Sequence, residues 1–88
     1  METGFEITVT GESMWPVLVP GKRYKADRDL EPRVGDIVVA QHPTDPSTTI
    51  VKRVATIIGG RYSLVGTVSW SANITVERSQ ILGVVITP

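Results

Sequence analysis

The stretch TTIVKRVATIIGGRYSLV, residues 48–65, decides the fold class. β-branched and other apolar residues dominate both halves of the stretch, and Gly59 and Gly60 divide them. A Gly-Gly pair suits a tight turn with positive φ, so the stretch predicts a β-hairpin of two consecutive strands.

Shorter runs of the same character flank this hairpin. FEITV (residues 5–9) alternates apolar and polar residues, which places Phe5, Ile7 and Val9 on one face of a strand. Further strands are predicted around Tyr24, over 37–39, in ANITVE (72–77) and in QILGVVI (80–86), whereas HPTDPS (42–47) predicts a loop. No window shows helical periodicity. The 88 residues therefore predict a single all-β domain over 1–88, with small curled antiparallel sheets forming a partly open barrel.

Composition narrows the classes of function. Nine Lys and Arg residues balance nine Asp and Glu residues, whereas a domain that grips nucleic acid usually has a basic excess. The chain has no cysteine, which excludes thiol catalysis and Cys-based zinc sites. No nucleic-acid partner, metal or cofactor is predicted. No run reaches the roughly 18 apolar residues of a membrane span, and the N-terminus has early acids and no apolar block. We therefore expect a cytoplasmic protein without a transmembrane segment.

Two adjacent cations, Lys52 and Arg53, lie within the largely apolar run TTIVKRVATII (residues 48–58). Alternation places them on opposite faces of the strand. In one interpretation the strand is an edge strand and both side chains reach water; spacing alone favours this. In the other, Lys52 is buried among apolar neighbours, which lowers its pKa and lets the neutral amine act as a general base.

Ser13 is the candidate nucleophile that would match such a base. It lies in GESMWPVLVPG (residues 11–21), whose glycines and prolines exclude a regular helix or plain strand. The single histidine, His42, precedes a proline in a predicted loop. A serine hydroxyl needs a neighbour to take its proton, and serine–lysine pairs are a known arrangement. A serine in an ordinary turn is the alternative.

Three boxes together resemble the signal peptidase I and LexA-type superfamily of serine–lysine peptidases. GESMWPVLVPG is similar to its nucleophile box, VGDIVVA (residues 34–40) to its Gly-Asp box, and IVKRV (residues 50–54) to the box with its lysine base. The boxes come in the family's order, and ILGVVI (residues 81–86) resembles its last strand. The resemblance implies the family's all-β catalytic core.

The resemblance also implies roles for individual residues. Ser13 would be the nucleophile, its backbone N–H an oxyanion donor, and Lys52 the general base. Larger members often carry a hydroxyl donor two residues before the nucleophile, where this chain has Gly11. An extended substrate would lie between residues 7–12 and 48–51, with a small residue before the cut. Its contacts would come from Thr10, Gly11, Glu12, Met14, Ile50 and Val51, although Met14 is expected to serve mainly the core.

The segment LVGTVSWSANITVERSQILG (residues 64–83) departs from the signal peptidase pattern. Gly66 is retained, but Thr67 and Val68 replace an Asp-Asn pair. In the family this box orients the lysine through a serine hydroxyl; Ser69, Ser71 and Ser79 are available for that role, and no motif assigns it.

The leading hypothesis is a small stand-alone endopeptidase that cleaves a protein precursor, similar to precursor maturation proteases of the superfamily. The 12 residues before Ser13 are too few for the DNA-binding domain of a LexA-type repressor. Two alternatives remain open: a catalytically impaired peptide-binding module on the same fold, and a self-cleaving LexA-type regulator.

Overall fold

The computed structural model describes residues 3–69 and 71–86 of the chain. Seven strands and one short 3₁₀ helix make up its regular structure. In chain order they are β1 (Gly4–Thr8), β2 (Arg23–Asp27), β3 (Ile37–His42), β4 (Asp45–Ile58), β5 (Arg61–Val65), β6 (Ile74–Glu77), η1 (Arg78–Gln80) and β7 (Ile81–Ile86). The prediction of an all-β fold is confirmed.

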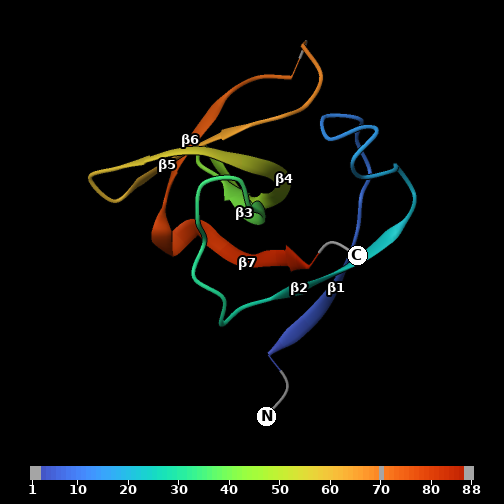
Figure 1. Cartoon of the computed structure of the whole chain (residues 1–88), viewed down its shortest axis with the longest axis horizontal. Helices are drawn as coiled ribbons and strands as arrows, with labels where there is room; N and C mark the ends of the chain where they lie inside the picture. The colour runs from blue at the N-terminus through green and yellow to red at the C-terminus, as the bar shows by residue number, and fades with distance from the viewer. Residues whose placement is uncertain (1–2, 70, 87–88) are drawn as a thin grey trace.

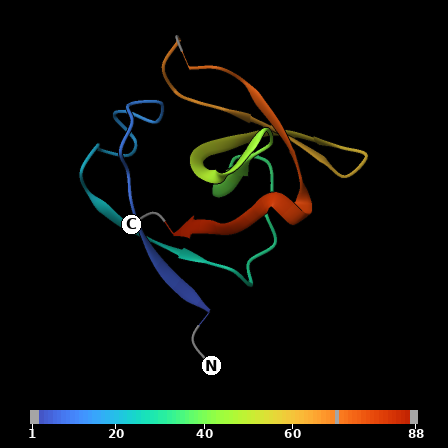
Figure 2. The same ribbon diagram turned by 180° about the vertical axis from the view of Figure 1, so that it is seen from behind.

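The seven strands form one antiparallel sheet in the order β1-β2-β7-β3-β4-β5-β6. The sheet is therefore continuous rather than split into several small sheets. Within the described ranges the outer strands β1 and β6 do not pair with each other, so the sheet curls but is not closed into a barrel. Figures 1 and 2 show the β4–β5 hairpin projecting on the side of the molecule opposite β1 and β2.

The β4–β5 hairpin forms as the sequence predicts. Gly59 and Gly60 occupy its turn with φ of 57° and 77°, a region that residues with a Cβ rarely adopt. β4 lies between β3 and β5 in the sheet, but β5 pairs with it only from Arg53 onward, so Lys52 is paired on the β3 side alone. β4 also begins earlier than predicted, at Asp45 inside the expected loop 42–47. The Asp45 carboxylate accepts hydrogen bonds from the Ser47 and Thr48 hydroxyls, which orders the start of the strand.

Two apolar clusters form the core, and β3 separates them because its side chains alternate between the two. Ile37 and Val39 face the first core cluster, whereas Val38 and Ala40 face the second. The first core cluster consists of Val9, Met14, Leu18, Tyr24, Ala26, Ile37, Val39 and Val85. The second consists of Val38, Ala40, Val54, Tyr62, Leu64, Val76, Ile81 and Val84.

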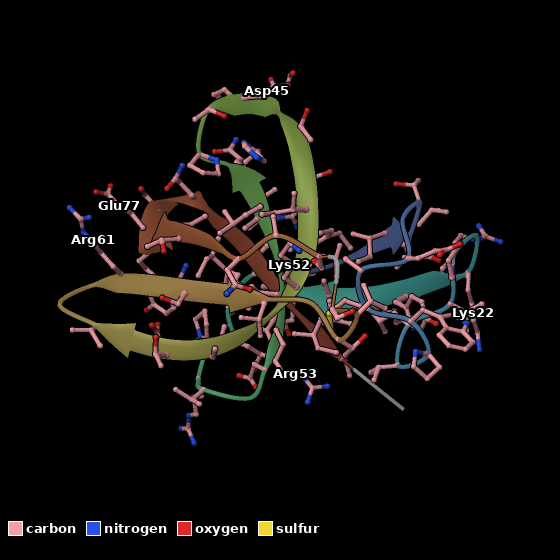
Figure 3. All side chains as sticks on the ribbon, turned by 90° about the horizontal axis from the view of Figure 1, so that it is seen from above. Lys22, Asp45, Lys52, Arg53, Arg61 and Glu77 are labelled. Atoms are coloured by element: carbon pink, nitrogen blue, oxygen red, sulfur yellow. The ribbon has the colours of Figure 1, made fainter. Side chains whose placement is uncertain are left out.

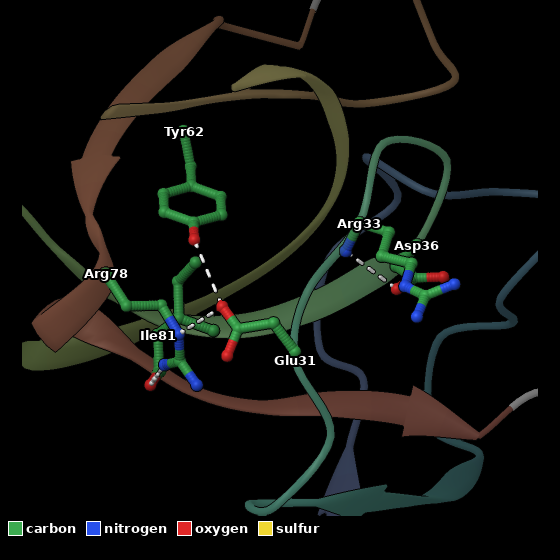
Figure 4. A network of polar contacts seen from close by, with 6 residues as sticks. All are labelled: Glu31, Arg33, Asp36, Tyr62, Arg78 and Ile81. Carbon is green, nitrogen blue, oxygen red and sulfur yellow. Dashed lines mark hydrogen bonds and ion pairs between the residues drawn. The ribbon is translucent and has the colours of Figure 1, made fainter. Parts of the chain in front are cut away.

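A polar network ties the segment before β3 to the far end of the sheet (Figure 4). Glu31 accepts hydrogen bonds from Arg78 Nε at 3.3 Å and from the Tyr62 hydroxyl at 3.5 Å. Nearby, the Asp36 carboxylate accepts a hydrogen bond from the Arg33 N–H at 2.9 Å, which closes the turn before β3. These contacts hold the loop that leads into the central strand. No helix among the described residues is long and apolar enough to cross a membrane.

Candidate active site

The Ser13 turn connects β1 to β2 and is anchored at both ends. Val9 N–H donates to the Lys22 carbonyl at 3.1 Å, and Gly21 N–H donates to the Val9 carbonyl at 2.6 Å. Inside the turn, Met14 and Leu18 are buried in the first core cluster with 1% and 0% of their surface exposed. Because its neighbours are fixed in this way, the partly exposed Ser13 is held at the surface in a defined position.

A cleft of about 430 Å³ lies in front of Ser13, between the end of β1 and the first half of β4. Four of the predicted substrate contacts line it: Thr10, Gly11, Ile50 and Val51. The full lining is Ile7, Thr8, Val9, Thr10, Gly11, Ser13, Val39, Thr49, Ile50, Val51 and Lys52. Glu12 is exposed and lies outside this lining, and Met14 points into the core. The predicted nucleophile and the predicted base therefore border one cleft.

Lys52 is the one buried charged side chain within the described ranges, with 6% of its surface exposed. On the same face of β4, Val54 is 1% exposed, and across the sheet Lys52 pairs with Val38, which is fully buried. Burial disfavours the charged ammonium and lowers the pKa of Lys52 below its ordinary value of 10.5. The interpretation of Lys52 as a lysine whose side chain reaches water is therefore wrong. Figure 3 shows Lys52 inside the body of the fold.

Ser71 supplies the hydroxyl that contacts this lysine. Lys52 Nζ donates a short hydrogen bond to Ser71 Oγ. Ser71 is itself placed by its backbone N–H, which donates to the Val68 carbonyl at 3.1 Å. Of the three serines that the sequence offered, only tertiary structure could select this one, because the segment lacks the family's motif spacing.

Ser13 and Lys52 are neighbours across the cleft but make different hydrogen bonds. Ser13 Oγ donates a long hydrogen bond of 3.5 Å to the carbonyl of Val51, the residue immediately before Lys52. Among the hydrogen bonds of the described ranges, none joins Ser13 Oγ to Lys52 Nζ, and none uses the Ser13 N–H. Catalytic hydrogen bonds are often long or misaligned without substrate.

The segment 66–68 clamps the backbone of the Ser13 turn. The Ser13 carbonyl accepts hydrogen bonds from Thr67 N–H at 2.7 Å and Val68 N–H at 3.4 Å. The Thr67 hydroxyl donates to the Trp15 carbonyl at 2.6 Å and lies 3.3 Å from the Ser13 carbonyl. In the sequence Thr67 stands out only as a departure from the family pattern; the structure shows that it fixes the nucleophile turn.

Gly66 is required by close packing rather than by its dihedral angles. A Cβ at this position would lie 2.5 Å from both the Ser13 carbonyl oxygen and Ser71 Oγ, closer than real Cβ contacts. The glycine therefore lets one short segment contact the serine turn on one side and the lysine's hydrogen-bond partner on the other. A side chain at this position would push the two apart.

This arrangement places a serine hydroxyl and an amine whose charge is disfavoured at one cleft, and nucleophilic catalysis by serine needs a neighbouring base. Within residues 3–69 and 71–86 there is no group of three or more His, Cys, Asp or Glu side chains that could hold a metal ion.

The comparison with protein families agrees with this geometry. Residues 3–83 match the family described as "Signal peptidase, peptidase S26", a stretch that includes Ser13, Lys52 and Ser71. The search of curated proteins returned no match. The resemblance read from the three boxes is confirmed, and the chain belongs to the peptidase S26 (signal peptidase) family, which consists of serine peptidases.

Proposed function

We propose that the protein is an endopeptidase that cleaves an extended segment of a protein substrate with Ser13 and Lys52. The observation that carries this proposal is the meeting of a partly exposed serine and a buried lysine of lowered pKa at one cleft. Neither residue type is reactive by itself at neutral pH, but a desolvated lysine can take a proton from a serine hydroxyl.

In this reaction Lys52 Nζ takes the hydroxyl proton as Ser13 Oγ attacks the scissile carbonyl. The tetrahedral oxyanion is stabilised by the Ser13 N–H, which makes no hydrogen bond within the described ranges. Lys52 then returns the proton to the leaving amine, and water hydrolyses the acyl-enzyme. Ser71 keeps the Lys52 side chain aligned through both proton transfers.

Free strand edges support an extended substrate. β5 pairs with β4 only from Arg53 onward, so the first half of β4 is paired on one side by β3 and open on the other. β1 is the outermost strand of the sheet and pairs only with β2 among the described strands. An added peptide can therefore form backbone hydrogen bonds with an edge that borders the cleft. Val9, Val39 and Val51 line the cleft together with Ser13, and we propose that the side chain before the cut is small and lies against these valines.

The test is cleavage of a peptide library and of candidate precursors, with products identified by mass spectrometry. The wild type is expected to cut, whereas Ser13→Ala and Lys52→Met are expected to lose at least about a thousandfold in kcat/KM, as removal of a nucleophile or its base does. Ser69→Ala, at an exposed serine on the same segment as Ser71, is the matched control. Equal cleavage by Ser13→Ala would contradict the proposal.

A second candidate function is a peptide-binding module that does not cut. The hydrogen bond from Ser13 Oγ to Val51 instead of to Lys52 favours it. In that case a peptide would bind wild type and Ser13→Ala with the same affinity, and the wild type would release no product on long incubation.

A further inference from the structure

Arg53, the cation next to Lys52, lines a second hollow in the molecule. This hollow, of about 510 Å³, is called here the Arg53 pocket, and Figure 3 shows the Arg53 side chain directed away from Lys52. Its lining residues are Pro16, Val17, Val19, Lys22, Tyr24, Gly35, Asp36, Ile37, Arg53 and Val85. The cleft at Ser13 and the Arg53 pocket share no lining residue, and both border the first core cluster.

Two cations of this pocket lack an acidic partner. The single ion pair of the described ranges joins Arg78 to Glu31, so neither Lys22 nor Arg53 is paired. Lys22 Nζ instead lies 5.8 Å from the centre of the Tyr24 ring. Asp36 contributes one negative charge, and one of its carboxylate oxygens already accepts a backbone hydrogen bond. The pocket therefore has a positive excess.

The Arg53 guanidinium also has an unsatisfied hydrogen-bond donor. Its Nε is the one buried side-chain nitrogen or oxygen, within the described ranges, that lacks a hydrogen-bond partner. A buried donor without a partner is costly, and such groups are rare in native folds. A carboxylate can accept two parallel hydrogen bonds from the edge of a guanidinium, so a bound carboxylate that draws the side chain slightly outward would satisfy Nε.

Part of the wall of the pocket is apolar. Val17 and Val19 are 45% and 44% exposed, which is high for an apolar residue. Both line the pocket together with Lys22. Ile37 and Val85 lie deeper and belong to the first core cluster. A ligand with apolar groups near its negative charge would therefore contact both the cations and the valines of this lining.

We propose that the Arg53 pocket binds a polypeptide segment that presents an acidic side chain between apolar ones. The carboxylate would pair with Arg53 and Lys22, and the apolar side chains would cover Val17 and Val19. An extended segment with apolar residues two positions before and after the acid provides both contacts, because side chains at i and i+2 lie on the same face of an extended chain. The pocket is separate from the cleft at Ser13, so this binding does not depend on cleavage.

The test uses the full chain carrying Ser13→Ala, so that no probe is cut. The probes are the acetylated, amidated peptides Leu-Ala-Glu-Ala-Leu and Leu-Ala-Gln-Ala-Leu, and their binding is followed by ¹⁵N NMR of the Arg53 Nε–H and the Val17 and Val19 amides. The glutamate peptide is expected to shift these signals saturably and to bind about tenfold more tightly than the glutamine peptide, as a charge-assisted pair requires.

Variants of the two cations locate the site. Arg53→Gln is expected to lose about tenfold in affinity for the glutamate peptide, Arg53→Lys less, and Lys22→Gln severalfold. Arg61→Gln is the matched control, because Arg61 borders a different hollow with Glu77. If Arg53→Gln does not fold, Arg53→Lys and Lys22→Gln carry the test.

Three outcomes would overturn the proposal: equal binding of both peptides, equal weakening by Arg61→Gln, or shifts confined to the cleft residues. A fourth is binding to vesicles of phosphatidylglycerol with no preference between the peptides, which would assign this face to an anionic membrane surface.

Discussion

Removing the Ser71 hydroxyl tests how the candidate base is held. In Ser71→Ala, Lys52 Nζ loses the acceptor of its short hydrogen bond while its surroundings stay apolar. The charged ammonium loses more stabilisation than the neutral amine, because a hydrogen bond made by a charged donor is stronger than one made by a neutral donor. The pKa of Lys52, already lowered by burial, is therefore expected to fall further.

The size of this fall follows from hydrogen-bond energies. A hydrogen bond to a charged group contributes about 1.5–3 kcal/mol, and one between neutral groups about 0.5–1.5 kcal/mol. The charged form thus loses about 1–1.5 kcal/mol more than the neutral form, and one pKa unit corresponds to about 1.4 kcal/mol. Ser71→Ala should lower the pKa of Lys52 by about one unit.

The assay is an NMR titration of Lys52 in protein with labelled lysine side chains, for wild type, Ser71→Ala and the control Ser69→Ala. Ser69 is exposed and forms no side-chain hydrogen bond within the described ranges, so its variant should titrate as wild type does. An unchanged or raised pKa in Ser71→Ala, or an equal change in Ser69→Ala, would refute the assignment of Ser71 as the partner of Lys52.

Three further predictions concern the neighbouring residues. Thr67→Val removes the hydroxyl that holds the Trp15 carbonyl and should lower kcat about fivefold at unchanged KM, with Thr67→Ser restoring the rate; equal kcat in all three proteins would contradict this. A Cβ added at Gly11 would meet no atom within 4 Å, so Gly11→Ser should fit and, as a second oxyanion donor, raise kcat about tenfold over Gly11→Ala. The free energy of unfolding should rise with pH between the lowered pKa of Lys52 and 10.5, because in this range Lys52 is protonated in the unfolded chain but not in the folded one. Urea titrations at several pH values should show a smaller rise for Lys52→Met than for wild type.

Local sequence patterns were enough to predict most of the strands and the β4–β5 turn. Alternation located Phe5 and Ile7 on the inner face of β1, and Gly59 and Gly60 marked the hairpin turn. The sequence could not establish where β4 lies in the sheet, because strand order depends on long-range pairing. That uncertainty mattered most for Lys52, whose side chain is buried although β5 pairs with β4 only from Arg53 onward.

The candidate site was predictable to the extent that family boxes cover it. Ser13 and Lys52 were identified by resemblance, and the structure places both at one cleft. Ser71 and Thr67 lie in the segment that departs from the family pattern, so no motif pointed to them. Their contacts arise because the β5–β6 connection folds back over the Ser13 turn, which is a tertiary feature.

The proposed reaction depends on Lys52 acting as the base for Ser13. The most direct test compares the pH dependence of kcat/KM, on a peptide that the library identifies, with the pKa of Lys52 measured by NMR in the same buffer. We expect the rate to rise with pH through one ionisation, its pKa to coincide with that of Lys52, and this value to lie below 10.5. An ordinary lysine pKa for Lys52, with a rate that rises at a different pH or not at all, would contradict this role.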